Sequence, residues 1–154
     1  MTAKRRRGRL RKSLLGAPSW VFRSRLGFVF GKRFICVEHE GRETAARHLT
    51  PLEVVHRDKD RNEYFVISAR GNRADWYRNI SKYPATAVYV GSRKRRVGQR
   101  MVPVDEAVAV MQIYQRAHEK AAKALLGLAG VSGADRVAWQ TAMQRLPMVA
   151  FRPK

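Results

Sequence analysis

The residues best suited to chemistry lie together in one twelve-residue stretch, 68–79, which reads SARGNRADWYRN. It carries two arginines close to Gly71, followed by Trp76 and Tyr77. Guanidinium groups, exposed backbone N–H groups and the positive end of a helix attract anionic groups, and flat aromatic rings offer surface for a ring system. The stretch therefore indicates a site for an anionic ligand that carries a ring. The alternative is a positively charged connector whose aromatic residues are ordinary core.

A strand and a helix are predicted on either side of this loop. The apolar run 64–67 is rich in β-branched and aromatic residues, which is typical of a strand. Residues 76–83 show a short helical pattern, with Asp75 placed to cap it and Pro84 placed to stop it. The strand thus leads into a glycine-containing loop, and the loop presents the N-terminus of a helix to the anionic ligand.

Other kinds of reactive site find no support in the sequence. The four histidines show no paired metal-binding spacing and Cys36 is the only cysteine, so we expect no metal site and a buried, inert thiol. The signatures of a nucleophile elbow, a phosphate-binding loop and a dinucleotide fold are absent. We therefore assign no catalytic residue, and the chemistry suits a phosphorylated cofactor that brings its own reactivity.

The chain is strongly basic. Its 154 residues are 45% apolar, which is a globular composition, and its net charge is +20. Seven of the basic side chains lie in residues 1–12, which we interpret as a basic flexible arm before a single domain over residues 13–154. The arm could contact an anionic membrane surface, contact the phosphates of nucleic acid, or remain solvated without a partner.

The sequence shows neither a membrane-spanning nor a secretory segment. No uninterrupted run of about 18 apolar residues occurs, and the basic start is followed by a region that Pro18 and two arginines interrupt. A single cysteine also allows no intramolecular disulfide. We therefore expect a cytoplasmic protein, which residues 1–12 could hold at the periphery of a membrane.

Short strands and tight turns account for most of the chain. Composition predicts a hairpin turn over residues 58–62 and a two-residue hairpin turn at Gly91-Ser92. Pro51 suggests an edge or bulged position in its strand. Strands are expected over residues 34–37, 49–56, 64–67, 86–90, 93–102 and 148–152. Strands of this length joined by hairpins favour a closed, meander-like barrel.

Three further helices accompany the predicted strands. Residues 18–30 form an aromatic-rich helical pattern, which we expect to pack across the mouth of the barrel, with insertion into a membrane interface as the alternative. An amphipathic stripe predicts one helix over residues 105–126, and a shorter pattern follows over 135–144. His118 falls on the stripe and is expected to be half-buried against the barrel.

Four motifs in a fixed order resemble those of a known family. They are ADWYRNI at 74–80, GRET at 41–44 leading into the strand at 52–55, TAVYV at 86–90, and LPMVAFRP at 146–153. Together they are similar to the deazaflavin-dependent nitroreductases, split-barrel oxidoreductases that use coenzyme F-420. The likeness runs from about Ala17 to Pro153. It implies an α+β fold: a six-stranded antiparallel split β-barrel with an N-terminal helix and flanking C-terminal helices.

The resemblance also implies a cofactor site. In that family the turn matching residues 41–48 and the loop matching 68–71 hold the phosphate and the anionic tail of the deazaflavin, with the ring against the barrel wall. The implied cofactor-binding residues are Arg42, Thr44, His48, Ser68, Arg70, Gly71, Trp76, Tyr77 and Asn79. The first turn departs from the family pattern: Glu43 and Ala45 replace a basic residue and a glycine, and Arg47 could restore the lost cation. His48 stands where an arginine is usual.

By this resemblance, the protein would transfer a hydride from reduced coenzyme F-420 to a planar small-molecule acceptor such as a quinone or a nitro compound. Flavin mononucleotide is the alternative cofactor, and split-barrel relatives are often homodimers. A second hypothesis is a non-catalytic barrel that binds a cofactor or an apolar ligand. A third is a nucleic-acid-binding module that uses the arm and residues 93–96, although alternation in a strand sends neighbouring side chains to opposite faces.

Overall fold

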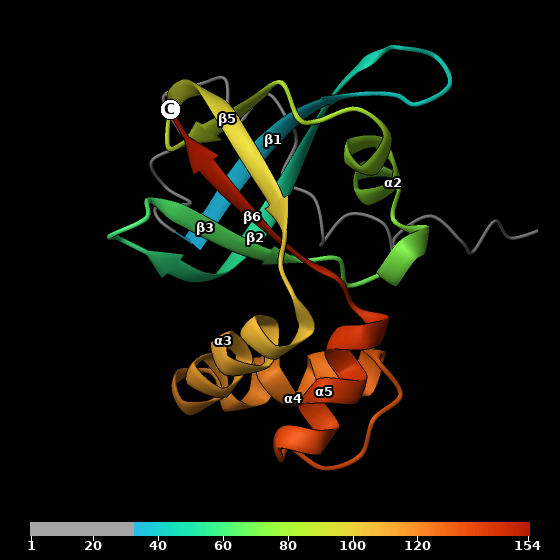
Figure 1. The fold of residues 1–154 in the computed structure, drawn as a ribbon, viewed down its shortest axis with the longest axis vertical. Helices are drawn as coiled ribbons and strands as arrows, with labels where there is room; N and C mark the ends of the chain where they lie inside the picture. Colours follow the sequence, from blue (N-terminus) through green and yellow to red (C-terminus); the bar gives the residue numbers. More distant parts are fainter. Residues whose placement is uncertain (1–32) are drawn as a thin grey trace, which may run out of the picture.

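Six antiparallel strands form a closed barrel in the order β1-β2-β3-β6-β5-β4 (Figure 1). The structure is a computed structural model, and it describes residues 33–154. The strands are β1 (Phe34–Glu40), β2 (Arg47–Asp58), β3 (Glu63–Ile67), β4 (Ala87–Val90), β5 (Arg93–Met101) and β6 (Met148–Pro153). The expected α+β fold with a six-stranded antiparallel barrel is confirmed. The expected arm over 1–12 and helix over 18–30 lie outside the described residues.

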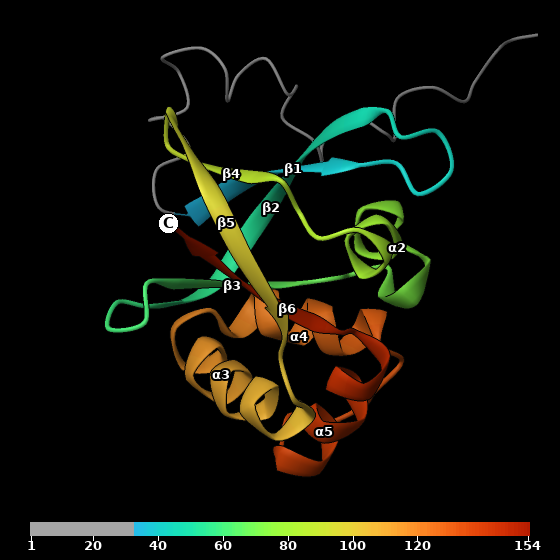
Figure 2. The ribbon, with the colours of Figure 1, turned by 45° about the horizontal axis from the view of Figure 1, so that its top comes forward.

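The helices are divided between two places on the barrel. They are α2 (Asp75–Lys82), α3 (Val104–Ala117), α4 (Glu119–Leu128) and α5 (Arg136–Arg145), with a short 3-10 turn η2 (Gly71–Arg73) before α2. The group α3, α4 and α5 lies below the barrel in both views, whereas α2 lies beside the barrel, near the turn between β1 and β2 (Figure 1, Figure 2). None of these described helices is long and apolar enough to cross a membrane.

Alternation along the strands produces two hydrophobic clusters. Val66 and Phe151 are buried with side chains from the other strands and from α2, and they fill the barrel. Their neighbours Phe65 and Ala150 point the opposite way and pack against α3, α4 and α5. The barrel is therefore filled by one cluster and covered on its β3–β6 side by a second, which leaves α2 as the helix that contributes to the interior.

The barrel is split because β2 changes partners along its length. Residues 47–53 of β2 pair with β1, and residues 54–58 pair with β3, with a register shift between Val54 and His56. Pro51 lies in the first half, opposite Cys36, where the described ladder runs on one side only. The missing N–H of proline is tolerated where a strand is paired on one side only, as expected for an edge position, whereas the bulge itself lies further along.

The single helix expected over 105–126 is wrong, because the chain bends at His118 (φ −137°, ψ 57°) and forms α3 and α4. A straight helix would separate Met111 and Leu126 by about 22 Å, but both residues belong to one cluster beneath the barrel. The bend lets both helices use their apolar stripes on that cluster. His118 is exposed rather than half-buried, and its ring lies 4.8 Å from the ring of Tyr114.

Candidate functional site

The turn between β1 and β2 is held against α2 by Arg42 and Asn79. Asn79 Oδ1 accepts a hydrogen bond from the backbone N–H of Arg42 (3.1 Å) and a second from its Nη1 (2.9 Å). Lys82 Nζ donates to the backbone carbonyl of Arg42 at 3.1 Å, from one turn further along α2. Arg42 and Asn79 are therefore in direct contact although they lie 37 positions apart in the chain. Both are among the residues implied by the family resemblance.

Asp75 does not cap α2 as predicted. The N-cap is Ala74, which has no side-chain acceptor, and Asp75 is the first helical residue. Its carboxylate accepts a hydrogen bond from Arg42 Nη1 at 3.2 Å. A carboxylate in the first turn still interacts favourably with the helix dipole, but it also places negative charge beside the guanidinium. Glu43 Oε1, 3.9 Å from Arg42 Nε, adds a second carboxylate to this group.

His39 continues the contact network into the barrel wall. It is 2% exposed, its Nδ1 lies 3.3 Å from Asn79 Nδ2, and its Nε2 lies 2.9 Å from Thr50 Oγ1. Because Asn79 uses its oxygen for Arg42, its amide nitrogen faces His39, and Nδ1 must accept. The proton of neutral His39 therefore resides on Nε2 and is donated to Thr50.

His39 is held in the neutral form. Burial, followed by the neighbouring charge of His48, lowers the pKa of His39 to about 4. The ring stacks on that of His48 at 5.5 Å, since the two residues are partners in the β1–β2 ladder. We did not single out His39 from the sequence. Its position opposite His48 across a short turn would have been the signal.

The remaining first-turn residues are exposed. Thr44 Oγ1 accepts a hydrogen bond from the backbone N–H of Ala46 at 3.3 Å, and His48 is exposed beside Gly41. Ala45 adopts φ +54°, the left-handed conformation that a glycine would occupy without strain. The turn thus keeps the shape expected of the family pattern although alanine replaces the glycine.

The loop after β3 is shaped by Ser68 and Gly71. Ser68 is fully buried, and its Oγ donates to the backbone carbonyl of Gly71 at 2.7 Å. Gly71 has φ +61°, and a Cβ at this position would lie 2.8 Å from the carbonyl oxygen of Arg145. Both residues therefore have a structural role in the loop, and a cofactor contact by either of them stays a prediction.

A pocket of about 620 Å³ opens on the outer side of this loop. We call it the loop pocket; it is lined by Ala69, Arg70, Gly71, Asn72, Arg73, Leu128, Ala129, Arg145 and Leu146. Three of these side chains are guanidinium groups, and none of the described lining residues is acidic. Arg145 was not anticipated, because it approaches the loop only through the packing of α5, where its Nη1 donates to the carbonyl of Ala129 at 2.7 Å.

Trp76 and Tyr77 follow the loop on α2. Both are half-buried, their rings meet edge to face at 5.9 Å, and both pack on the cluster that fills the barrel. Neither of the two described pockets is lined by both Arg42 and Arg70. The structure therefore gathers the implied site residues into two groups, one around Arg42 and Asn79 and one in the loop pocket.

A family model described as F420H(2)-dependent quinone reductase matches residues 22–124, which is more than half of the chain. The chain belongs to this family. The matched segment contains the first turn, the 68–79 loop and α2, and the expected relationship to deazaflavin-dependent split-barrel enzymes is confirmed. Coenzyme F-420 is the cofactor of the family, and the protein is accordingly an oxidoreductase by descent. The search of curated proteins found no match.

Solved structures show the same fold at low sequence identity. One is described as the structure of an F420-H2 dependent reductase, FDR-A, with 18% identity, a TM-score of 0.51, and coverage of 78% of this chain and 93% of that chain. A domain-swapped dimer matches at 17% identity and a TM-score of 0.51, covering 78% and 79% of the two chains. The heme storage protein HutZ from Vibrio cholerae matches at 10% identity and a TM-score of 0.50, covering 82% and 85%.

The donor groups of the two clusters differ in how well they fit an anionic cofactor. The loop pocket offers Arg70, Arg73 and Arg145 with no acidic lining residue among those described, so its chemistry fits phosphate or carboxylate groups. Around Arg42, by contrast, two carboxylates already face the guanidinium. The loop pocket is therefore the better match in charge for the anionic part of coenzyme F-420.

Proposed function

We propose that this protein binds coenzyme F-420 at the loop pocket and α2 and reduces a planar acceptor of the quinone or nitro type. The observation that carries this proposal is the loop pocket itself. Its three guanidinium groups have no acidic residue in the described lining, and the half-buried Trp76 and Tyr77 follow the loop directly in the chain, within a fold of the matching family. Reduced coenzyme F-420 supplies the hydride when it is bound.

The chain would contribute binding and orientation. Arg70, Arg73 and Arg145 would pair with the anionic groups of the cofactor, and Trp76 and Tyr77 would offer apolar surface to its ring. The Arg42–Asn79 contact would hold the first turn in place, with neutral His39 supporting the amide from behind. We assign no general acid, because no titratable group in the loop pocket is placed to serve as one.

Cofactor binding is tested by titrating the purified full-length protein with oxidised coenzyme F-420 and following the fluorescence of the deazaflavin. We expect saturable binding that the double variant Arg70→Ala/Arg73→Ala weakens by about tenfold or more, since each lost charged hydrogen bond is worth about 1.5–3 kcal/mol. Lys123→Ala, an exposed cation on α4, should bind as the wild type does. Absence of binding at high micromolar cofactor would remove the proposal.

A non-catalytic binding protein is the second candidate function. The carboxylates of Asp75 and Glu43 favour it, because a first turn whose Arg42 is already engaged would take less part in orienting a bound cofactor for hydride transfer. The two functions differ in turnover: the reductase oxidises reduced coenzyme F-420 in the presence of a benzoquinone or nitrobenzene derivative. The binding protein would retain the cofactor and show no acceptor-dependent oxidation.

The cellular setting forms part of the same proposal. Apolar quinones partition into membranes, and the seven basic side chains of residues 1–12 would attract an anionic bilayer surface at roughly 1 kcal/mol each. We propose a cytoplasmic protein that binds peripherally to such a surface. Co-sedimentation with vesicles of anionic phospholipid, compared with neutral vesicles and with a chain lacking residues 1–12, tests this placement.

A further inference from the structure

The interior of the barrel changes from apolar to basic at the tip of the β4–β5 hairpin. Arg95 pairs with Val88 and Arg93 pairs with Val90, so these arginines stand on the strand face that further down fills the barrel. Lys94, between them, faces the other way and bonds to Glu38 at 3.0 Å. The interior face of the hairpin therefore ends in two guanidinium groups.

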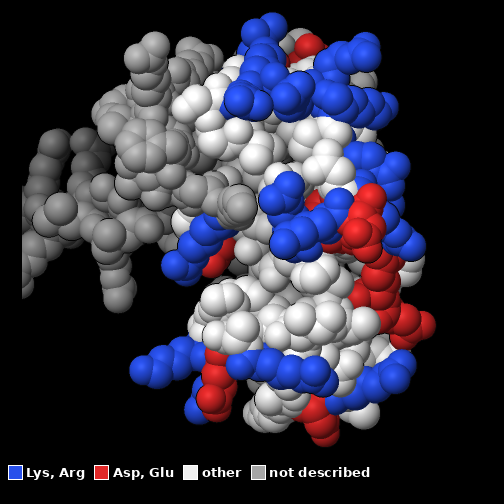
Figure 3. Space-filling view, turned by 90° about the vertical axis from the view of Figure 1, so that its left-hand side faces the viewer, with Lys and Arg blue, Asp and Glu red and all other residues white. Residues whose placement is uncertain are grey.

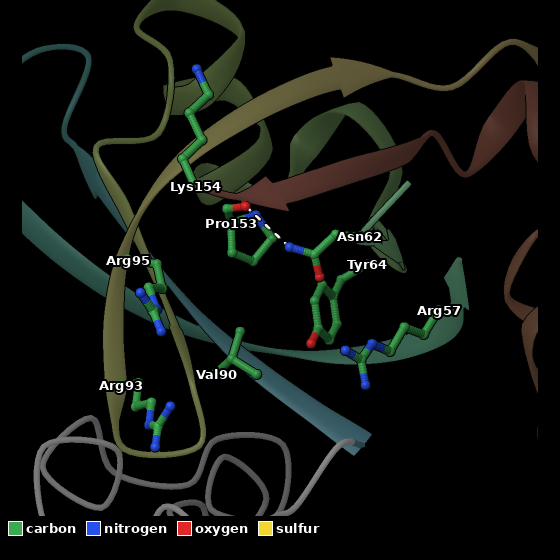
Figure 4. A pocket seen from close by; sticks show the side chains of 8 residues that line it. All are labelled: Arg57, Asn62, Tyr64, Val90, Arg93, Arg95, Pro153 and Lys154. Atoms are coloured by element: carbon green, nitrogen blue, oxygen red, sulfur yellow. Dashed lines mark hydrogen bonds between the residues drawn. The ribbon is translucent and has the colours of Figure 1, made fainter. Parts of the chain in front are cut away.

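These arginines line a pocket of about 400 Å³ that we call the basic mouth (Figure 4). Its described lining consists of Arg57, Asn62, Tyr64, Val90, Arg93, Arg95, Pro153 and Lys154. Four of these side chains are cationic and none is acidic. The residues come from β2, β3, the β4–β5 hairpin and the end of β6, so the fold brings together four separate segments of the chain.

Arg57 of this pocket has one donor without an acceptor. Its guanidinium lies over the ring of Tyr64, 5.0 Å from the ring centroid, and its Nε is buried without a hydrogen-bond partner. No other buried side-chain nitrogen or oxygen in the described part of the chain is left in this state. A buried donor without an acceptor is destabilising by about 1–3 kcal/mol, so the described residues do not fully satisfy the guanidinium of Arg57.

Carboxylates neutralise other cations of the barrel but not those of the basic mouth. Arg100 is bound by Glu63 and Glu106, and Lys94 is bound by Glu38. No ion pair within residues 33–154 involves the four cations of the mouth. Figure 3 shows a band of basic side chains across the upper, barrel part of one face and others across its lower part, with the largest group of acidic side chains along the right-hand edge.

We propose that the basic mouth binds a small phosphorylated molecule. Arginine forks match phosphate oxygens in geometry and charge, and about 400 Å³ is larger than one phosphate and within the usual size of small-molecule pockets. The site is separate from that of the proposed cofactor. Gln99 of β5 binds the carbonyl of Ile80 in α2, and the strand from Arg93 to Gln99 spans about 20 Å.

A small ligand fits the arrangement better than nucleic acid does. The guanidinium groups of Arg57, Arg93 and Arg95 surround one concavity instead of forming a flat stripe along the phosphates of a strand (Figure 4). Nucleic acid is nevertheless an outcome that the experiment distinguishes, because phosphate groups are common to both ligands.

The test uses the full-length chain and inorganic pyrophosphate as the probe, by isothermal titration calorimetry at constant ionic strength. All proteins carry Arg70→Gln/Arg73→Gln, so that the loop pocket contributes little binding. Adding Arg93→Gln/Arg95→Gln should weaken the pyrophosphate affinity by about tenfold or more. Adding Arg116→Gln/Lys123→Gln, which removes the same number of exposed charges elsewhere, should leave the affinity within about twofold.

The proposed site would be contradicted if both charge-reduced proteins lost pyrophosphate affinity equally. It would also be contradicted if the Arg93→Gln/Arg95→Gln protein lost none. A single-stranded oligonucleotide that displaces pyrophosphate, with an affinity that falls steeply with salt, would overturn the choice of a small ligand. Arg57→Lys provides a second variant, which keeps the positive charge of a lining residue but removes its guanidinium fork, and it should also weaken binding. The Arg93→Gln/Arg95→Gln protein, without the loop-pocket substitutions, should bind coenzyme F-420 with the affinity of the wild type. This result would distinguish the basic mouth from the proposed cofactor site.

Discussion

Asn79 Oδ1 accepts two hydrogen bonds from one residue, Arg42, through its backbone N–H and its Nη1. The amide nitrogen of Asn79 faces His39, so the side chain uses both of its ends while it is 4% exposed. This contact joins the first turn to α2. The geometry of the family's two most recognisable motifs therefore depends on one buried amide.

Replacing Asn79 should destabilise the fold. Asn79→Ala leaves the partly buried N–H of Arg42 and the buried ring nitrogen of His39 without partners, at a cost of about 1–3 kcal/mol in the free energy of unfolding. Urea denaturation measures this loss. Asn72→Ala, at an exposed position in the loop, is the matched control and should stay within about 0.5 kcal/mol of the wild type. Equal stability of the two variants would contradict the role assigned to Asn79.

Stability should fall as the pH is lowered from about 6.5 towards 4, because of His39. Its pKa in the folded protein is about 4 and its ordinary value is 6.5, so the unfolded chain binds the proton first. The stabilisation is complete above pH 6.5 and is lost progressively below it, by on the order of 3 kcal/mol in total. Urea unfolding between pH 7.5 and 5 measures the slope above the range in which the carboxylates titrate.

His39→Gln should abolish most of that slope, because glutamine does not titrate. His118→Gln is the control, since His118 is exposed on the bend between α3 and α4 and its removal should leave the slope intact. A slope that survives in His39→Gln would show that another group carries the pH dependence.

Gly71→Ala should be destabilising, whereas Gly127→Ala should be stabilising. At Gly71 the backbone has φ +61° and a Cβ would lie 2.8 Å from the carbonyl oxygen of Arg145, so we expect a loss of about 2 kcal/mol or more. Gly127 lies inside α4, where a Cβ would have no other group within 4 Å, and alanine there should add about 0.5–1 kcal/mol. Opposite shifts in the thermal midpoint would confirm both expectations.

Loss of the Glu63 carboxylate should destabilise the fold more than loss of the Glu53 carboxylate, although both pair with arginine. Glu63 is buried and bonds to Arg100 Nη2 at 2.8 Å and to Arg152 Nη2 at 3.2 Å, and the hydrogen bonds from Arg100 hold its pKa below the usual value. Glu63→Gln should cost about 2–3 kcal/mol in the free energy of unfolding. Glu53, which pairs with Arg33 in solvent, should cost less than about 0.5 kcal/mol when changed to Gln. Similar losses in chemical denaturation would contradict this ranking.

Local signals in the sequence predicted the strands and their turns. Asp58 accepts hydrogen bonds from the backbone of Asp60 and Arg61, as expected for a turn that begins with aspartate, and Gly91 takes the positive φ that its hairpin needs. Asp135 caps α5 by accepting from Ala138. Such features depend on a few neighbouring residues and can therefore be predicted from the sequence. The division into an arm and one domain from residue 13 stays a prediction.

Other features lacked any local signal. The bend at His118 follows from packing α3 and α4 on one cluster, and the residues around it include neither glycine nor proline. Asp75 was expected to be the cap because aspartate before a helix usually is. Here the carboxylate turns to Arg42 instead. Contact with a residue distant in the chain outweighed the local preference in both cases.

By itself the sequence determined a basic chain of six short strands, because strand periodicity and turn composition are local properties, and its ordered motifs carried the resemblance to deazaflavin-dependent split barrels. Only the tertiary structure decided which cations act together. It placed Arg145 with Arg70, tied Arg42 to Asn79, and brought Arg57 to Arg93 at the mouth of the barrel. Closure of the barrel creates these neighbours from distant segments, and no local pattern encodes the distances between them.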